Sequence, residues 1–483
     1  MKNLEHLIRN ANELNIRGSV YIPIKGFSLD SRSIGKEYCF VARKGAALDG
    51  HKFIHDAIDN GATSVLCETL PEELKESVTY IQTAQIGKTL ALMLNEFYNY
   101  PSDKIKLIGI TGTNGKTTTT TLLFNLFRQL GYKCGLISTI KYIIDQEVHE
   151  STHTTPDIIN LYKLIAQMRD RSCSHIFMEV SSHAVEQERI KDLKFDIAVF
   201  TNITQDHLDY HKTFKNYIYA KKKFFDELKE ESVALINTDD SNAKVMVQNT
   251  KAKVKTFGIL NMADYKGKIL ENSFYGLQLK VNHREIHSSL VGDFNASNLV
   301  CVYAVASILG ANEDEVLVHM SSLKSVEGRF DWYKNNNNSK IGIVDYAHTP
   351  DALEKILQTI QKLKQPQQSI ITVIGCGGNR DKTKRPIMAH IAVSNSDKVI
   401  FTADNPRDED PGEIIQEMEA GVDAILVQKY ISLVDREQAI KTACLLSNSS
   451  DIILVAGKGH EKYQEIKGKK FPFDDMQKLK SFL

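Results

Sequence analysis

The chain has 483 residues, 42% of them hydrophobic and 25% charged, which is ordinary for a soluble globular protein but too long for one hydrophobic core, so we expect two to four domains. Its 60 basic and 60 acidic residues cancel, which argues against a nucleic-acid-binding protein. The seven cysteines are scattered, the first residues lack the apolar core of a signal peptide, and no stretch approaches the roughly 20 apolar residues of a membrane span. We therefore expect a cytoplasmic enzyme that does not insert into a membrane, and we take it to be a monomer.

The first hundred residues alternate short apolar runs with helical patterns. A tyrosine-, proline- and serine-containing stretch at 98–103 then predicts a domain boundary, because these residues disfavour the interior of an element. The predicted strands are 38–42, 64–67 and 79–82, and the predicted helices are 51–60 and 88–98.

From residue 104 to about residue 328 the chain repeats a strand–helix pattern. The strand candidates are short, apolar and rich in β-branched residues, as expected for a parallel sheet covered on both faces. They are 107–110, 175–180, 197–202 and 233–237, with a helix predicted at 121–130.

A second alternating series follows the polar tract 335–338, which we expect to be a surface loop. Its predicted strands are 341–345, 370–374, 398–402 and 452–456, and its predicted helices are 351–363, 411–420 and 435–446. The expected fold is thus α/β with three domains. Residues 1–103 form a small α/β domain, residues 104–328 a central P-loop-type domain with a mostly parallel sheet and flanking helices, and residues 329–483 a Rossmann-like domain.

A glycine-rich turn lies between the predicted strand 107–110 and the helix after it. Glycines allow backbone N–H groups to approach phosphate oxygens, and the helix N-terminus favours an anion. Ile110 stands where the strict P-loop pattern has glycine, so this is a compact variant of that pattern. The alternative is a turn that only connects the strand to the helix and binds nothing. The candidate ATP-binding residues are Gly112, Thr113, Asn114, Gly115, Lys116, Thr117 and Thr118, with Lys116 on the β/γ-phosphates and Thr117 on Mg²⁺.

Polar clusters also follow the next two predicted strands, which is where ligands bind in open α/β sheets. Glu179 ends one strand and His207 follows the other, and both side chains suit a divalent metal. A single histidine is more often structural, but a histidine-rich stretch near a phosphate loop favours function.

Five motifs resemble those of the Mur ligase family, in the family's order and over nearly the whole chain. They are LDSR at 29–32, TGTNGKTT at 111–118, EVSSH at 179–183, TNITQDHLDYH at 201–211 and YxxAKxxFF at 217–225. The family comprises ATP-dependent ligases that add amino acids to a UDP-linked muramyl peptide, and it includes folylpolyglutamate synthetases. The resemblance implies that Lys221 is carbamylated and serves, with Lys116, Glu179 and His207, in catalysis and metal binding.

The resemblance also implies an ATP clamp from the second half of the chain. The matching segments are GDFNASN at 292–298, GR at 328–329 and DYAHTPD at 345–351, although a helix cap and a strand-to-helix turn would explain parts of them. Amide side chains suit a purine edge, and a guanidinium suits phosphate. The implied ATP-binding residues are Asn295, Asn298, Arg329, Asp345, Tyr346 and His348.

Three further segments indicate which amino acid is added. DNPR at 404–407 matches members that add meso-diaminopimelate, GKGHE at 457–461 matches the site of its far amino and carboxyl groups, and GCGGNRD at 375–381 brings Arg380. A guanidinium can receive the second carboxylate of diaminopimelate bidentately. The implied amino-acid-binding residues are Arg380, Asp404, Asn405, Arg407, Gly457 and Glu461, and those for the UDP-linked substrate are Ser31, Arg32, Thr154, Thr155, Ser181, Gln187 and Arg189.

The expected function is ATP-dependent addition of meso-diaminopimelate to UDP-MurNAc-L-Ala-D-Glu in peptidoglycan precursor synthesis, with ATP and Mg²⁺. A lysine-adding relative is the first alternative, disfavoured by Arg407. A folylpolyglutamate-synthetase-like ligase is the second, disfavoured by DNPR and LDSR. A P-loop GTPase or ATPase switch would need a guanine motif such as NKxD, which the sequence lacks.

Overall fold

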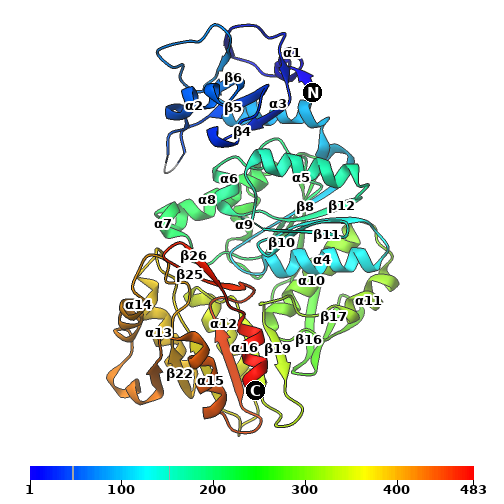
Figure 1. The fold of residues 1–483 in the computed structure, drawn as a ribbon. Helices are drawn as coiled ribbons and strands as arrows, with labels where there is room; N and C mark the ends of the chain where they lie inside the picture. The colour runs from blue at the N-terminus through cyan, green and yellow to red at the C-terminus, as the bar shows by residue number, and fades with distance from the viewer. Residues whose placement is uncertain (46–47, 152) are drawn as a thin grey trace.

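The computed structural model describes residues 1–45, 48–151 and 153–483. Three main sheets, each built from one consecutive part of the chain, follow one another along the molecule (Figure 1). The α/β class and the three-sheet architecture confirm the expected fold. Within the described residues no helix is long and apolar enough to cross a membrane.

The N-terminal sheet has five strands in the order β2-β7-β6-β5-β4, and only the β2–β7 pair is antiparallel. Its apolar strand residues pack against the helices that alternate with them. The strands are β2 Asn15–Arg17, β4 Gly26–Ser28, β5 Tyr38–Ala42, β6 Ala62–Cys67 and β7 Thr79–Gln82, beside the small pair β1 Lys2–Asn3 and β3 Pro23–Ile24. The helices are α1 Leu4–Ile8, α2 Ile54–Asp59 and α3 Ile86–Tyr98, with 3₁₀ turns Ser31–Ser33, Gly50–Phe53 and Pro101–Lys104.

The joint between the first and second sheets is a tight turn fixed by side chains. Asn99 and Tyr100 both adopt left-handed backbone conformations, with φ of 56° and 50°. The Tyr100 hydroxyl donates to the buried Glu96 carboxylate at 2.6 Å. Asn95 donates to Asp192 of the following part of the chain at 2.9 Å. The predicted boundary at 98–103 is therefore a well-bonded turn.

The central sheet has eleven strands in the order β11-β10-β9-β12-β8-β13-β14-β15-β16-β17-β18. The run from β9 to β16 is parallel, and antiparallel pairs extend both edges. The strands are β8 Lys106–Thr111, β9 Cys134–Ile137, β10 Lys141–Ile144, β11 Glu147–Glu150, β12 His175–Glu179, β13 Ile197–Phe200, β14 Val233–Asn237, β15 Lys253–Gly258, β16 Tyr265–Ser273, β17 Gly276–Val281 and β18 Arg284–Ser288. The helices are α4 Lys116–Gln129, α5 Ile158–Asp170, α6 Ser182–Glu186, α7 Leu208–His211, α8 Phe214–Asp226, α9 Ala243–Met246, α10 Asp293–Ile308 and α11 Glu313–Ser322.

Helix α4 begins five residues earlier than its apolar spacing predicts. Gly115 has a φ of +85° and directly precedes the helix, so the first helical residue is Lys116. Five threonines follow, and the first four of them are buried, so this part of the helix shows no apolar spacing in the sequence. The lysine thus lies at the N-terminus of α4.

The C-terminal sheet has six strands in the order β19-β20-β24-β21-β22-β23, and only β19 is antiparallel. Apolar clusters cover both faces, as the buried-strand pattern predicts. The strands are β19 Asp331–Lys334, β20 Ile341–Asp345, β21 Ile370–Ile374, β22 Lys398–Phe401, β23 Tyr430–Ser432 and β24 Ile452–Ala456, followed by the hairpin β25 Tyr463–Ile466 and β26 Lys469–Pro472. The helices are α12 Pro350–Leu363, α13 Lys384–Asn395, α14 Pro411–Glu419, α15 Arg436–Leu446 and α16 Asp475–Phe482, with the 3₁₀ turn Ala424–Lys429.

Candidate functional site

Two adjoining cavities lie at the carboxyl ends of the central and C-terminal sheets. One has a volume of about 690 Å³ and surrounds the phosphate-loop sequence, and the other has a volume of about 1270 Å³. Asp206, His207, Tyr346 and His348 line both. The two spaces therefore adjoin, and we call them the loop cavity and the large cavity.

The phosphate loop joins β8 to α4 and borders the loop cavity. Gly112 has a φ of +150°, and a Cβ there would lie 2.0 Å from the Thr201 hydroxyl, so only glycine fits. The Lys116 ammonium donates to the carbonyls of Gly112 and Thr113 at 2.9 and 2.8 Å. Residues directly after β13 support the loop: the Thr201 hydroxyl donates to the Asn114 carbonyl at 2.6 Å, and the Asn202 side chain donates to the same carbonyl at 3.1 Å. The Lys116 ammonium therefore lies against its own loop, within reach of an anion bound there.

A buried carboxylate faces the first turn of α4. Glu179, the last residue of β12, is 0% exposed. Its Oε2 accepts from the Thr117 hydroxyl at 3.0 Å, and its Oε1 accepts from the Thr139 backbone N–H at 2.7 Å. Arg329 donates from Nη2 to the same Thr117 hydroxyl at 3.2 Å, and its buried Nε has no hydrogen-bond partner among the described residues. A carboxylate and a hydroxyl are the hard oxygen donors that Mg²⁺ prefers, and the unpaired Nε fits an anion beside them.

Lys221 lies in α8 with its side chain almost fully buried beneath the phosphate loop. Its Nζ donates to the Gly112 carbonyl at 2.8 Å and lies 3.4 Å from the Thr111 hydroxyl. Burial, together with the nearby Lys116 charge, lowers the pKa of Lys221 well below its ordinary value. A lysine with this environment carries a neutral amine more readily than an exposed lysine does.

His207 follows β13 and borders both cavities. Loss of hydration lowers its pKa to about 4, although Asp206 lies 3.5 Å away and acts in the opposite direction. His207 is therefore neutral near pH 7. Thr117, Glu179, His207 and Lys221 all line the loop cavity, but within the described part of the chain no group of three His, Cys, Asp or Glu side chains is arranged to hold a metal ion.

Residues of the C-terminal part of the chain line one side of the loop cavity. Arg329 lies over the Tyr346 ring, 4.4 Å from its centroid, and Asp345 accepts from the Phe330 backbone N–H at 2.6 Å. Burial raises the pKa of Asp345 to about 6. Burial likewise lowers the pKa of His348 to about 4. These groups carry less charge near neutral pH than the same groups would in water.

Asp351 borders the large cavity and belongs to the DYAHTPD motif, although the motif alone indicated no role for it. It begins the first turn of α12, and its Oδ2 accepts from Asn114 at 2.9 Å and from the Thr204 hydroxyl at 3.0 Å. Lys355 lies 2.9 Å from the same oxygen. Asp351 therefore joins the C-terminal segment to the phosphate loop. Only its acidic character near a helix N-terminus was readable from sequence.

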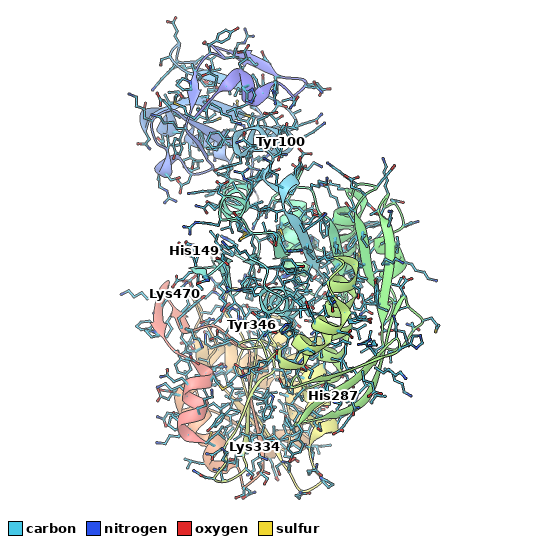
Figure 2. All side chains as sticks on the ribbon, turned by 90° about the vertical axis from the view of Figure 1, so that its right-hand side faces the viewer. Tyr100, His149, His287, Lys334, Tyr346 and Lys470 are labelled. Carbon is cyan, nitrogen blue, oxygen red and sulfur yellow. The ribbon has the colours of Figure 1, made fainter. Side chains whose placement is uncertain are left out.

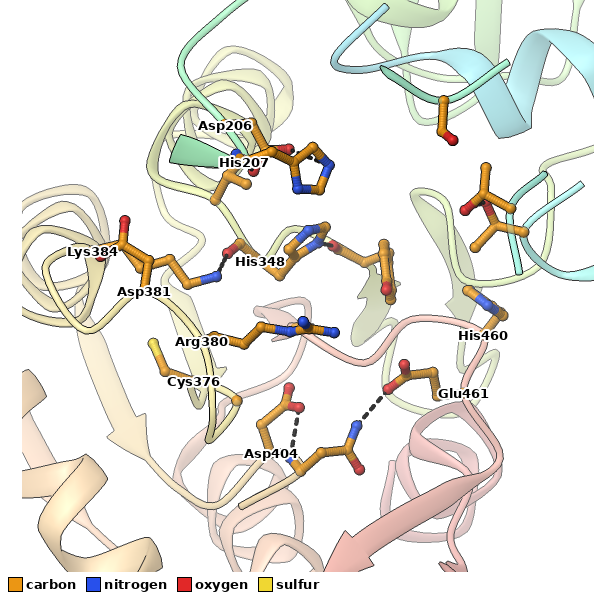
Figure 3. A pocket seen from close by; sticks show the side chains of 18 of the residues that line it. Asp206, His207, His348, Cys376, Arg380, Asp381, Lys384, Asp404, His460 and Glu461 are labelled. Atoms are coloured by element: carbon orange, nitrogen blue, oxygen red, sulfur yellow. Dashed lines mark hydrogen bonds and ion pairs between the residues drawn. The ribbon is translucent and has the colours of Figure 1, made fainter. Parts of the chain in front are cut away.

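A polar network follows β22 and β24 at the floor of the large cavity (Figure 3). Asn405 donates to Glu461 Oε2 at 2.7 Å, and the fully buried Lys458 lies 3.4 Å from the same oxygen. Lys458 also donates to the Asn405 side chain at 3.2 Å. Burial, with the charge of nearby Asp404, raises the pKa of Glu461. Lys458 thus connects Asn405 and Glu461 within this network. The sequence alone indicated no role for it.

Arg407 and Gly457 occupy conformations that the cavity requires. Arg407 has a φ of 52°, donates from Nη1 to the Gly378 carbonyl at 2.7 Å and lies 3.5 Å from Glu465. A Cβ at Gly457, where φ is +114°, would lie 2.5 Å from Asp404 Oδ2. Arg380 points toward the middle of the cavity, between His348 and Glu461 (Figure 3).

Residues expected around the UDP-linked substrate are only partly brought together. Thr154, Thr155, Ser181 and Arg189 line the large cavity. Gln187 is not among the lining residues, but its side chain accepts from Arg189 Nη2 at 2.7 Å.

The N-terminal pair of that set lies apart from both cavities. Ser31 and Arg32 are in a 3₁₀ turn of the N-terminal segment, and Arg32 pairs with Asp30 at 2.8 Å. Figure 2 shows how far the N-terminal sheet stands from the level of Tyr346.

The amino-acid set and most of the ATP set line different cavities, and Tyr346 and His348 of the ATP set line both. All six of the amino-acid set line the large cavity, namely Arg380, Asp404, Asn405, Arg407, Gly457 and Glu461. The ATP set that lines the loop cavity comprises Thr113, Asn114, Gly115, Lys116, Thr117, Thr118, Asn298, Arg329, Asp345, Tyr346 and His348. Gly112 and Asn295 lie just behind it, and Asn295 supports Asn298 by accepting from its side chain at 3.1 Å.

A phosphate loop whose cavity adjoins a second cavity lined by another α/β sheet is typical of nucleotide-dependent enzymes in which two segments share the site. Three family descriptions match the chain: the Mur ligase family catalytic domain at 23–98, the Mur ligase middle domain at 110–306 and the Mur ligase glutamate ligase domain at 328–459. The chain belongs to the Mur ligase family of amide-bond-forming ligases.

Individual relatives are similar over the full length. Two proteins described as UDP-N-acetylmuramoyl-L-alanyl-D-glutamate–2,6-diaminopimelate ligase are 50% and 51% identical to this chain, from Cytophaga hutchinsonii and Phocaeicola vulgatus. Each alignment covers 99% of this chain and 99% or 98% of the relative. A solved structure with the same description has a TM-score of 0.69 at 30% identity, covering 100% of this chain and 98% of the other. The MurF ligase of Thermotoga maritima, solved in complex with ADP, shares the fold with a TM-score of 0.63 at 19% identity, covering 90% and 94%.

Proposed function

We propose that this protein is an ATP-dependent ligase that joins meso-diaminopimelate to the D-Glu side-chain carboxylate of UDP-MurNAc-L-Ala-D-Glu, in peptidoglycan precursor synthesis. The observation that carries the proposal is that all six residues of the amino-acid set line one cavity, which shares lining residues with the cavity of the phosphate loop. The diaminopimelate ligases that match along the whole chain support the choice of substrate. We propose that the reaction takes place in the cytoplasm, because its substrates are ATP and a nucleotide-linked sugar.

The reaction that fits this arrangement has two bond-forming steps. The D-Glu carboxylate attacks the γ-phosphorus, so that an acyl phosphate forms and ADP leaves. The amine of diaminopimelate then attacks the acyl carbon, loses a proton, and displaces phosphate to give the amide. Lys116 and Arg329 supply positive charge where the phosphoryl group moves, and the two cavities keep the acyl phosphate beside the amine.

Thr117 and Glu179 are the residues that would hold Mg²⁺, with His207 and Lys221 on the same cavity. When bound, the ion supplies charge neutralisation to the phosphates. Asp345 and Asn298 border the same cavity and would contact the nucleotide. Asn295 would act only by holding Asn298.

We further propose the domain limits 1–103, 104–328 and 329–483, with the far end of the nucleotide substrate bound by the first domain at Ser31 and Arg32. The separate sheets support these limits. Gly328 has a φ of +65°, and a Cβ there would lie 2.1 Å from the His460 backbone nitrogen, so the second limit falls at a constrained turn.

Release of ADP tests the function directly. Purified protein is given ATP, Mg²⁺ and UDP-MurNAc-L-Ala-D-Glu, with meso-diaminopimelate, lysine or no amino acid. We expect amino-acid-dependent ADP release with diaminopimelate and very little with lysine. Equal or greater release with lysine would overturn the substrate, and no amino-acid-dependent release would overturn the ligase itself.

We also propose that Lys221 is carbamylated, since its buried amine is poor at holding a proton. The neutral amine attacks CO₂ and loses one proton, giving an anionic carbamate. Lys221→Ala should lose activity and regain part of it with added formate or acetate, which return the missing anionic oxygen. The exposed Lys215→Ala in the same helix is the matched control and should behave as the wild type. Rescue by methylamine in place of acetate would show that the ammonium is the working form.

A further inference from the structure

A fully buried ion pair joins the first residues of α15 and α16. Arg436 Nε donates to Asp475 Oδ1 at 2.8 Å, and Arg436 Nη2 donates to Asp475 Oδ2 at 2.7 Å. Both side chains are 0% exposed, and the two helices pack together (Figure 1). This bidentate geometry fixes the orientation of the guanidinium. Neither residue is among those that line the loop cavity or the large cavity.

The same guanidinium holds the backbone directly before both loops of the amino-acid set. Nη1 donates to the Ala403 carbonyl at 3.3 Å, and Nη2 donates to the Ala456 carbonyl at 3.1 Å. Ala456 is the last residue of β24, and Ala403 lies two residues beyond β22, on the other side of β21 in the sheet. Asp404 and Gly457 are the next residues along the chain. One buried side chain therefore spans the ends of two strands that are not neighbours.

The two loops that start there must be placed closely. A Cβ at Gly457 would lie 2.5 Å from Asp404 Oδ2, and Asn405 donates to Glu461 across the gap at 2.7 Å. Asp404 and Glu461 place two carboxyl groups on this wall of the large cavity (Figure 3). A positive charge buried behind them offsets their mutual repulsion, and binding sites lose affinity when such groups shift by about 0.5 Å.

We propose that Arg436 and Asp475 are positioning residues for the incoming amino acid. The pair fixes the loops 404–407 and 457–461 relative to each other and so sets the affinity for the amino acid, without touching it. This inference rests on the proposed function. If the pair served stability alone, altering it would change the KM for all three substrates to a similar extent, because all three bind the same folded protein.

The test measures KM separately for ATP, UDP-MurNAc-L-Ala-D-Glu and meso-diaminopimelate in the full-length protein. Asp475→Asn keeps the shape of the side chain and removes its charge, and Arg436→Lys keeps the charge but loses the fork of donors. We expect either variant to raise KM for diaminopimelate by tenfold or more, with KM for ATP and for the UDP-linked substrate changed less than twofold. Asp475→Asn should also retain ADP release once diaminopimelate is saturating.

Asp451→Asn is the matched control. Asp451 is also buried in the C-terminal segment, but it precedes β24 at the opposite end of the sheet, where it accepts from Ser369 and Asn448 backbone N–H groups at 2.8 and 2.7 Å. It should leave all three KM values near those of the wild type. An equal rise of all three KM values in the Arg436 and Asp475 variants, no rise at all, or failure of both variants to fold would each overturn the positioning role. Wild-type protein without amino-acid-dependent ADP release would instead overturn the proposed function.

Discussion

Asp345 links the pH of the solution to the stability of the protein. Its pKa is about 6 in the folded protein, against an ordinary value of 3.8, because the carboxyl is buried. The folded state therefore binds a proton more tightly than the unfolded state. The stabilisation is fully present below about pH 4 and is lost as the pH rises through 6, by on the order of 3 kcal/mol at about 1.4 kcal/mol per pKa unit.

Asp345→Asn should remove this dependence, because an amide keeps the hydrogen bond from Phe330 without a titrating proton. We expect the variant to gain stability relative to the wild type between pH 4 and pH 7. Urea unfolding of both proteins at several pH values measures the difference. Parallel stability curves over that range would show that Asp345 ionises normally.

Arg407 offers a sharper test of which amino acid the large cavity receives. Lysine lacks the second carboxylate of meso-diaminopimelate, so a site built for that group should reject it by a factor of order 10⁴. Arg407→Ala should therefore lower kcat/KM for diaminopimelate by about 10²-fold or more and barely change the small rate with lysine. Both rates are measured by amide formation at matched concentrations.

The exposed Arg171→Ala is the control for a lost arginine. If Arg407→Ala reduced both rates equally, its bonds to the loop at Gly378 would be its main role and the guanidinium would not select the substrate.

At the scale of elements, the N-terminus of α12 is attached to the phosphate loop through Asp351. Replacing it with asparagine removes the charge that Asn114, Thr204 and Lys355 share. We expect Asp351→Asn to raise KM for ATP about tenfold, at about 1.4 kcal/mol per factor of ten, since hydrogen bonds to a charged group contribute roughly 1.5–3 kcal/mol. Steady-state kinetics with the other two substrates saturating measure the change.

Glu354→Gln in the same helix is the matched control, because within the described structure the Glu354 side chain bonds only to Gln358. An unchanged KM for ATP in Asp351→Asn would show that α12 does not help to hold the nucleotide.

The buried parallel strands are the elements that the sequence predicts best. Strands β5, β14, β20 and β24 have the expected bounds, because an apolar run covered on both faces needs no partner to be recognised. The edge hairpins were missed. Strand β11 is mostly exposed and β16 mixes exposed with partly buried residues, so neither contains an apolar run or a regular alternation that would mark it as a strand.

The placement of the candidate site residues at the cavities was predictable where they belong to a local motif. Lys116 follows a glycine turn, Glu179 lies at the end of a predicted strand, and Arg407 lies just beyond another predicted strand. The proposed roles of Asp351 and Arg436 could not be predicted from the sequence. Asp351 contacts Asn114, which lies 237 positions away along the chain. Arg436 contacts backbone carbonyl groups, which every residue carries and which therefore give no sequence signal.

At the scale of the whole molecule, the two cavities involve the central and C-terminal sheets and leave the N-terminal sheet aside. Saturating ADP with Mg²⁺ should therefore slow amide hydrogen exchange at the start of α4 and of α12 and leave β5, β6 and β7 unchanged. Hydrogen exchange followed by mass spectrometry makes the comparison.

Lys116→Ala is the control for this exchange experiment and should show little protection by ADP at either helix. Equal protection of β5 to β7 would contradict the separation, because it would mean that the nucleotide orders the N-terminal sheet as well.

The turn after α3 has a consequence for the length of what can react. Asn99 and Tyr100 hold left-handed conformations, and hydrogen bonds of Glu96 and Asn95 support the turn, so it constrains the separation between the first sheet and the phosphate loop. With the uridine end held by the first domain, as proposed, the carboxylate at the other end reaches the loop cavity only if the molecule between them has one particular span. A precursor shorter or longer by one amino acid would bind at one end and present the wrong atom at the other.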